Sequence, residues 1–167
     1  MTHGEQRLWL IQQLLNERND AAGVQIPEDE QGQKDLLRGL MNIRMPDPID
    51  DEFLRIQDEY LTEENLAEGV VKIEDLTPVK ADNRLYIWQG DMSRLAVDAV
   101  TLPANSGFTG CYQYLHNCLD NILGSKAGIE LRLFTNSIIT NKAILSLPVR
   151  PRSHRDLTFR ANILSIR

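Results

Sequence analysis

The first third of the chain alternates apolar and polar positions with the period of amphipathic helices. Residues 5–18 place an apolar side chain every three or four positions, and Asn19 and Asp20 follow as a stop signal. The repeating residues are Leu8, Ile11, Leu14 and Leu15. This pattern predicts a first helix over residues 5–18.

Two more helices are expected before residue 65. Pro27 opens the second helix, an acidic first turn follows, and Pro46 and Pro48 end it. Its predicted apolar face comprises Leu36, Leu37, Leu40, Met41 and Ile43. The third helix is expected over residues 50–61. Its candidate buried positions are Phe53, Leu54, Ile56 and Tyr60. The pattern of apolar positions over residues 1–65 therefore predicts a small helical unit. Its apolar faces are expected to pack on the domain that follows.

The hydrophobic pattern changes after Asp75. Residues 84–89 form a short aromatic and β-branched run typical of a strand, and residues 95–102 form a second apolar run. Residues 115–133 return to helical spacing. Two strand-like runs followed by a helix indicate an α/β domain.

Composition narrows the classes of function. The 167-residue chain carries a formal net charge of -6, which disfavours a protein that binds nucleic acid through general phosphate attraction. No apolar run approaches the roughly 20 residues needed to cross a bilayer. The first five residues lack the basic region of a signal peptide. We expect a cytoplasmic protein with neither nucleic acid nor a membrane as its partner.

The two cysteines of the chain, Cys111 and Cys118, enclose His116 at a spacing that suits a metal site. Two thiolates and an imidazole this close in sequence can converge on one Zn2+ if the chain turns tightly. A tetrahedral zinc ion with three protein ligands keeps its fourth position for water or substrate, which is the catalytic pattern. The alternative is a pair of buried cysteines with an unrelated histidine between them.

Two stretches of the sequence carry a resemblance to a known family. Residues 88–106 read Trp88-Gln-Gly-Asp-Met-Ser-Arg-Leu-Ala-Val-Asp-Ala-Val-Thr-Leu-Pro-Ala-Asn-Ser106 and resemble the macrodomain opening G-D-I-T-x-L-x-V-D-A-I-V-N-A-A-N-S. Residues 110–121, with Ala127 and Gly128 after them, resemble the zinc-containing branch that accompanies sirtuin-type ADP-ribosyltransferases in bacteria and fungi. The resemblance covers residues 84–133. It implies an α/β fold, a three-layer α/β/α macrodomain over residues 76–142, preceded by an all-α extension over residues 1–75.

The resemblance also implies an activity and a set of site residues. The activity is hydrolysis that removes ADP-ribose from modified protein side chains, with an ADP-ribosylated protein and ADP-ribose as partners. Asp91 and the Met92 backbone would bind the adenine, and Asn105 would lie near the distal ribose. Asp120 would act with Asn105 in catalysis by orienting the ribose or a water molecule. Zinc would be the cofactor, held by Cys111, His116 and Cys118.

Each of these roles has a simpler alternative. Asp91 suits a helix N-cap, Asn105 suits a turn, and Asp120 suits a solvated position on a helix. Asp98 is interpreted as structural. Leu102 and Pro103 replace the first Asn-Ala of the family pattern, so polar groups that would face ADP-ribose are lost. The alternative functions are a non-catalytic ADP-ribose-binding module and a fragment that retains only a helical interaction unit.

Charge separates the last residues from the rest of the chain. Residues 1–142 have a net charge of -10, whereas residues 143–167 carry five arginines and one acid. Macrodomains continue here with a P-E-P-T-G-Q-A-K-like stretch, which this tail lacks. Codons for residues 142–167 can be chosen that, read two bases later, spell G-H-P-E-P-T-G-Q-A-K-V-T-P-G-F-D-L-P-S-K-Y-F-I-H-T. We therefore expect residues 143–167 to be a frameshifted, non-native tail on a truncated macrodomain.

Overall fold

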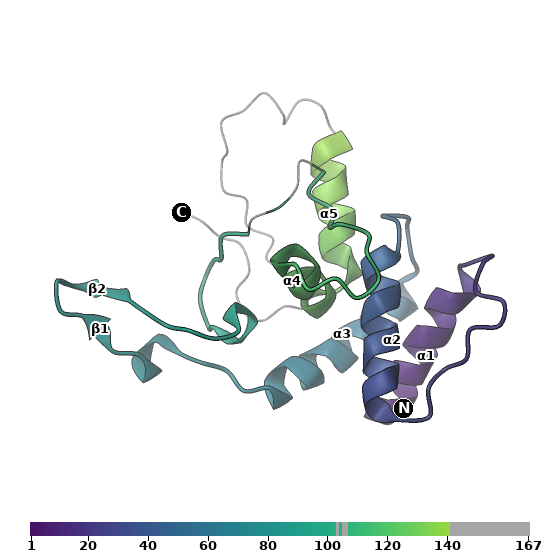
Figure 1. Cartoon of the computed structure of the whole chain (residues 1–167), viewed down its shortest axis with the longest axis horizontal. Helices are drawn as coiled ribbons and strands as arrows, with labels where there is room; N and C mark the ends of the chain where they lie inside the picture. The colour runs from purple at the N-terminus through teal and green to yellow at the C-terminus, as the bar shows by residue number, and fades with distance from the viewer. Residues whose placement is uncertain (103, 105–106, 141–167) are drawn as a thin grey trace.

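Three helices form the N-terminal part of the molecule, and two more helices pack beside them (Figure 1). The computed structural model describes residues 1–102, 104 and 107–140, so the predicted tail lies outside the described residues. The first three helices are α1 (His3–Asn16), α2 (Glu30–Ile43) and α3 (Asp51–Ala67). The elements that follow are η1 (Ile73–Asp75), β1 (Pro78–Val79), β2 (Asp82–Tyr86), η2 (Met92–Arg94), α4 (Leu119–Ala127) and α5 (Ile129–Thr140). We call α1, α2 and α3 the helical unit.

Each helix of the helical unit begins at a side-chain cap. Thr2 and Glu5 form a reciprocal capping box at the start of α1. Asp29 accepts a hydrogen bond from the backbone N–H of Gly32 at 2.8 Å, and Asp50 caps α3 in the same way. The predicted start of the second helix at Pro27 is therefore wrong by three residues, because Asp29 supplies the cap and α2 begins at Glu30.

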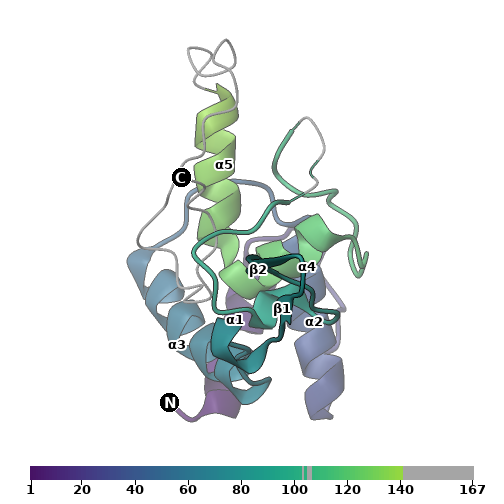
Figure 2. The same cartoon turned by 90° about the vertical axis from the view of Figure 1, so that its left-hand side faces the viewer.

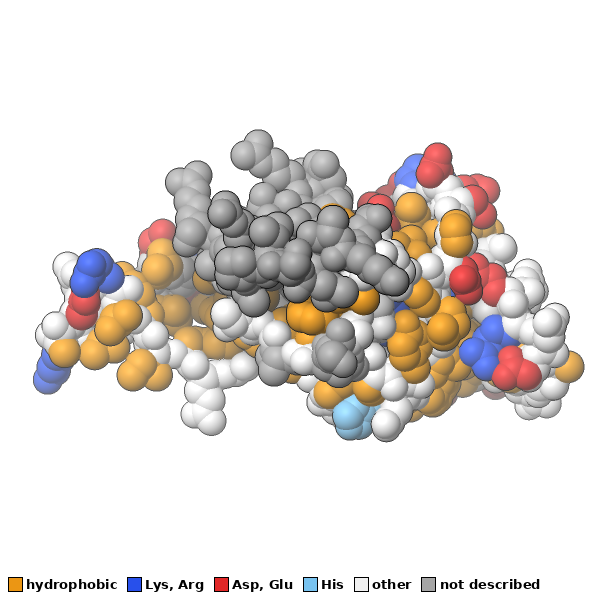
Figure 3. All heavy atoms as spheres, turned by 90° about the horizontal axis from the view of Figure 1, so that it is seen from above, with side chains coloured by type: hydrophobic (Ala, Val, Ile, Leu, Met, Phe, Trp, Pro, Cys, Tyr) orange, Lys and Arg blue, Asp and Glu red, His pale blue; other side chains and the backbone are white. Residues whose placement is uncertain are grey.

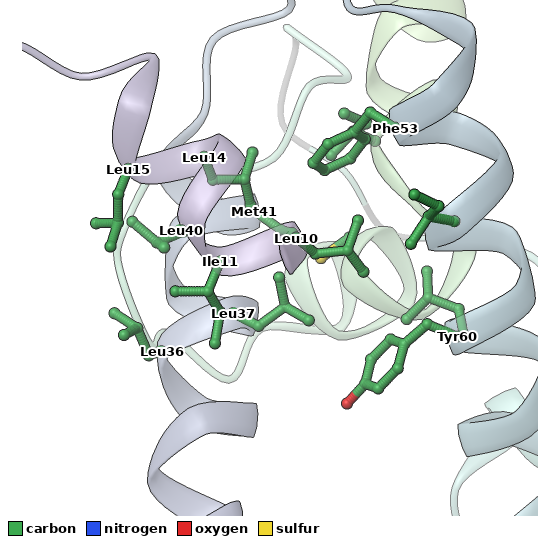
Figure 4. Packing of buried hydrophobic residues seen from close by; sticks show 13 residues of the cluster. Leu10, Ile11, Leu14, Leu15, Leu36, Leu37, Leu40, Met41, Phe53 and Tyr60 are labelled. Atoms are coloured by element: carbon green, nitrogen blue, oxygen red, sulfur yellow. The ribbon is translucent and has the colours of Figure 1, made fainter. Parts of the chain in front are cut away.

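The apolar faces of the helical unit pack mainly on one another rather than on a following domain (Figure 4). The buried cluster comprises Leu10, Ile11, Leu14, Leu15, Leu36, Leu37, Leu40, Met41, Phe53, Ile56, Tyr60, Leu61 and Ile129. The sequence-based interpretation of Leu8 as part of this face is wrong. Leu8 is 39% exposed, whereas Leu10 is 1% exposed and takes its place. Ile129 is the member of this core that α5 contributes.

The predicted single helix over residues 115–133 is divided in two. It begins only at Leu119, and Gly128 interrupts it with φ +90°, a conformation that favours glycine. The backbone N–H of Ile129 then bonds to the buried Gln57 Oε1 of α3 at 2.9 Å. The break thus lets α5 begin against the helical unit, from which it projects in both views (Figures 1 and 2).

The strands that the structure describes form one antiparallel hairpin, β1 with β2, which projects from the helices (Figure 1). The predicted strand over residues 84–89 is shifted, because β1 pairs with residues 82–86. Leu85 and Ile87 are 57% and 81% exposed, and Figure 3 shows hydrophobic side chains on this part of the surface. The second apolar run is not a strand, since its pairing within the described part is one isolated bridge between Leu95 and Val71.

The described residues thus combine helices with a small sheet, which is compatible with an α/β fold. A second buried cluster lies under η2 and α4 and comprises Val100, Leu123, Ala127 and Leu131. The three layers of a macrodomain and the boundary near residue 75 remain predictions. Across the part of the chain that the structure describes, no helix combines the length and the apolar character needed to cross a membrane.

Candidate metal centre

Cys111, His116 and Cys118 converge at one point on the loop that leads into α4. Their candidate ligand atoms all lie within 4.8 Å of one another. The Sγ atom of Cys111 is 3.2 Å from Nδ1 of His116 and 3.8 Å from Sγ of Cys118. Two thiolates bound to a tetrahedral ion at about 2.3 Å would be separated by about 3.8 Å. The cluster could therefore hold a metal ion, and its sulfur spacing fits tetrahedral coordination.

Left-handed backbone turns bring the three ligands together. Gly110 has φ +84° and Tyr112 has φ +53° on either side of Cys111. A Cβ atom at Gly110 would lie 2.8 Å from Oδ1 of Asn121, so glycine is needed for space as well as for conformation. Cys118 occupies the position before α4, so the helix fixes one end of the loop. We call residues 110–118 the metal loop.

Asn121 supports the metal loop from the first turn of α4, a role that the sequence-based interpretation missed. Its side chain is fully buried. Oδ1 accepts a hydrogen bond from the backbone N–H of Cys111, and Nδ2 donates to Sγ of Cys111, each at 3.2 Å. Nδ2 also donates to the carbonyl of Gln113 at 3.3 Å. Such contacts orient a metal ligand and stabilise its thiolate form. Its place three residues after Cys118, on the same face of the helix, was the available signal.

Arg132 holds the other side of the metal loop against α2. Its Nη1 donates to the carbonyls of Met41, Asn42 and Arg44 at 2.9, 2.9 and 2.6 Å. These carbonyls lie at the C-terminal end of α2, where a cation is favourable. The Arg132 guanidinium carbon also lies 4.8 Å from the centre of the Tyr112 ring. One side chain of α5 therefore joins α2 to the residue beside Cys111.

Burial shifts the ionisation of two acidic groups beside the cluster. Burial raises the pKa of Asp120 above its usual value, against the lowering effects of the Arg132 guanidinium and the Gly110 backbone. Burial also raises the pKa of Cys118, with a further contribution from the Cys111 thiol. A metal ion would have to displace the proton of this thiol on binding. Asp120 is half-buried rather than freely solvated, in contrast to the simpler alternative.

Asp91 adopts the capping role that the sequence left open. Its Oδ1 accepts a hydrogen bond from the backbone N–H of Ser93 at 2.9 Å, which caps η2. Its Oδ2 lies 3.5 Å from Nζ of Lys126 on α4. Partial burial raises its pKa, but the hydrogen bonds from Ser93 and the charge of Lys126 outweigh this effect and lower the pKa overall. Met92 begins η2 and packs against the second buried cluster.

One cleft connects the neighbourhood of Asp91 with the metal loop. It has a volume of about 590 Å³ and lies between α2, α3 and α4. Asp91 and Lys126 line one part of it, and Asn117 of the metal loop lines another. Its volume is within the range typical of small-molecule sites, about 300–1,000 Å³. The predicted site residue Asn105 lies outside the described residues.

Comparisons with known proteins give a consistent set of relatives. The chain is 48% identical over 134 residues to a protein-ADP-ribose hydrolase of Treponema medium, which covers 79% of this chain and 51% of the relative. It is 41% identical over 131 residues to a protein-ADP-ribose hydrolase of Staphylococcus aureus strain MRSA252, with 78% and 48% covered. A probable bifunctional ADP-ribose hydrolase/ADP-ribosyltransferase of Fusarium oxysporum is 34% identical over 106 residues, with 58% and 18% covered. No family model matches. The chain spans about half the length of the two bacterial relatives.

Proposed function

We propose that this chain is part of a zinc-dependent macrodomain hydrolase that removes ADP-ribose from modified protein side chains. The observation that carries the proposal is the convergence of Cys111, His116 and Cys118 within 4.8 Å. It occurs in a chain whose relatives bear the name protein-ADP-ribose hydrolase. A ligand set of two thiols and one imidazole suits zinc, and a bound zinc ion would supply a Lewis acid with one open position.

The residues around the cluster suggest how a substrate would be arranged. Asp91 would receive the adenine amino group, beside the Met92 backbone, while keeping its cap to η2. The cleft that Asp91 shares with Asn117 supports a ligand that reaches from η2 towards the metal loop. Asp120 and Asn105 would orient the distal ribose or the attacking water near the ligand cluster. Amide and carboxylate oxygens suit that role because they accept hydrogen bonds from hydroxyl groups.

The proposal extends to the organisation of the chain. Residues 1–75 would be the helical extension and residues 76–142 the opening part of the macrodomain. Residues 143–167 would be a frameshifted tail, and the alternative reading of their codons supports this. The tail would replace a phosphate-binding segment, so the 167-residue chain would hydrolyse its substrate poorly. Sequencing the gene across the Lys142 codon tests this step directly.

The activity test compares the 167-residue chain with a chain in which the reading frame is restored after Lys142. Metal content is measured by elemental analysis, and release of ADP-ribose is measured from an ADP-ribosylated acceptor protein. We expect one zinc ion per chain in both forms, and release by the restored form only. Cys118→Ser should remove most of the zinc, because a hydroxyl is a poor substitute for a thiolate. Asp98→Ala is the control, since Asp98 is exposed.

Three outcomes would overturn parts of the proposal. Equal zinc content in Cys118→Ser and the parent would exclude this ligand set. A restored chain that binds ADP-ribose in calorimetry but releases none would indicate a binding module instead of a hydrolase. A restored chain that neither binds nor releases ADP-ribose, and of which limited proteolysis leaves only residues 1–65, would favour the helical interaction unit.

A further inference from the structure

Gly39 of helix α2 leaves a space beside the helix, and a side chain of the metal loop occupies that space. A Cβ atom on Gly39 would lie only 2.5 Å from Cζ of the Tyr114 ring, and the ring edge would overlap it more closely still. Glycine in a helix interior costs roughly 1 kcal/mol relative to alanine. Gly39 therefore weakens α2 locally, and the space that it leaves is occupied by the ring of Tyr114.

Two other residues of α2 bind the backbone of the same loop. Nδ2 of Asn42 donates to the carbonyl of Tyr114 at 2.9 Å, and Asn42 is almost fully buried. Nη2 of Arg38 donates to the carbonyl of His116 at 3.1 Å and to Oδ1 of Asn117 at 2.7 Å. Position 42 lies four residues after position 38 and three residues after position 39, so it shares a helix face with both.

These contacts from α2 constrain the position of His116 rather than that of Cys111 or Cys118. Cys111 is fixed by Asn121, and Cys118 is fixed by its place at the start of α4. His116 is exposed and lies between these two anchored cysteines, two residues before Cys118. The contacts from α2 are made to Tyr114 and to the backbone of His116 itself. Without them, His116 would keep only contacts within the loop, namely the ring contact with Cys111 Sγ at 3.2 Å and the backbone bond to Gln113 at 3.3 Å.

We infer that helix α2 positions His116 for metal binding through Gly39, Arg38 and Asn42. The helical unit is then part of the metal centre rather than a separate appendage. This inference rests on the proposed metal site and adds a set of positioning residues to it. A positioning element of this kind raises metal affinity because less loop entropy is lost when the ion binds.

The test is titration of the metal-free full chain with Co2+ alone, followed by absorption spectroscopy. Thiolate-bound, tetrahedral Co2+ has a characteristic absorption, so both affinity and ligand geometry are observed. Gly39→Ala should weaken Co2+ binding at least tenfold, because the added methyl group displaces Tyr114 and the backbone that leads to His116. Competition with Zn2+ in the same cuvette should show the same ratio.

The matched control is Gly124→Ala on α4, where a Cβ atom would meet no atom of the described residues within 4 Å. Both substitutions replace a helix-interior glycine by alanine, so their intrinsic helix propensity changes equally. Gly124→Ala should change Co2+ affinity less than twofold. In a Tyr114→Ala background, Gly39→Ala should also change affinity less than twofold, because the overlap with the ring is gone. Helical circular dichroism of each metal-free variant checks that α2 is intact.

The outcomes separate this inference from the metal site on which it rests. A parent that binds Co2+ tightly while Gly39→Ala binds equally well, with an unchanged spectrum, would overturn the positioning role alone. An equal loss of affinity from Gly39→Ala in the presence and absence of the Tyr114 ring would also overturn it. A parent chain that binds no Co2+ would overturn the metal site and this inference together.

Discussion

The helical unit and the metal loop lie against each other but take their shape from different sources. Each helix of the helical unit starts at a cap supplied by the residue before it. The buried apolar residues recur at helical spacing within each helix. Residues 110–118 form no helix or strand. Their turns depend on side chains outside the loop: Arg38 of α2 and Arg132 of α5, which are distant in the sequence, and Asn121 of α4, which follows the loop directly. The first region is thus specified locally, and the second is specified by its surroundings.

This difference implies a direction of dependence between the two regions. Damage to the core of the helical unit should disturb the metal loop, because Asn42 and Arg132 act through α2. Damage to the metal loop should leave the helical unit intact, since no member of its buried cluster lies in that loop.

The largest effect is expected from Phe53→Ala in the core of the helical unit. Phe53 is 1% exposed, and truncation of a buried phenylalanine destabilises a protein by about 3–5 kcal/mol. Metal affinity should fall with it, since residues of α2 belong to the same buried cluster as Phe53. Urea unfolding followed by circular dichroism measures the first effect, and Co2+ titration the second. Leu66→Ala is the control, because Leu66 lies on the same helix and is 63% exposed. A stable Phe53→Ala variant would contradict the dependence on this core.

The next effect is expected at the junction between α4 and α5. Gly128→Ala would place a Cβ atom 2.5 Å from Nε2 of Gln57 and would force alanine into a backbone region that costs about 1–3 kcal/mol. Gly23→Ala is a matched control, since Gly23 also has positive φ but a Cβ atom there would meet none of the described atoms within 4 Å. Thermal unfolding should show the larger loss for Gly128→Ala. Equal losses would mean that the contact with Gln57 does not hold α5 on the helical unit.

A smaller and more specific effect is expected from Asn121→Ala. Loss of its bonds to Cys111 should lower metal affinity about 10–100-fold, which is typical of residues that orient metal ligands. The helical unit should unfold at nearly the same denaturant concentration as in the parent. Asn136→Ala on α5 controls for loss of an asparagine away from the metal loop. A variant that retains full metal affinity would exclude a supporting role for this amide.

The sequence predicts the helical unit well because its signals are local. Caps, prolines and helical periodicity indicate three helices. The errors lie in the helix ends, chiefly the start at Pro27 and the end of the third helix at residue 61 instead of Ala67, in Leu8, and in the expectation that the apolar faces pack on a following domain. The sequence also groups Cys111, His116 and Cys118 by residue type and spacing, and the structure brings these three side chains together. It does not indicate Arg38 or Asn42, because their roles arise from contacts between elements. Asn121 was missed although its spacing from Cys118 offered a signal. The break at Gly128 was missed because it depends on Gln57, far away in the sequence.

A still smaller effect, dependent on pH, is expected from Glu64 of the helical unit. Burial raises the pKa of Glu64, but hydrogen bonds from His3 and Lys34 outweigh this and lower it overall. A lowered pKa means that the stabilisation is present above the pKa of the unfolded chain and is lost as pH falls through the folded value. Glu64→Gln should therefore show a smaller loss of stability from pH 7 to pH 3.5, by less than about 1 kcal/mol. The exposed Glu28→Gln is the control, and equal acid sensitivity in all three chains would contradict the assignment.

The smallest effect is expected at Ile87, outside both regions of the comparison. Ile87 is 81% exposed, so Ile87→Thr removes little buried apolar area and should change stability by less than about 0.5 kcal/mol. Threonine keeps the β-branched shape, so the local backbone preference is unchanged. The same substitution in the chain with its reading frame restored sharpens the comparison. If residues 76–142 open a complete sandwich there, further strands should cover Ile87, and the loss should rise to about 1–2 kcal/mol. Chemical unfolding of the four chains measures this difference directly. Equal, small losses in both backgrounds would mean that the restored segment does not pack on Ile87, and that this side chain stays at the surface as it does here.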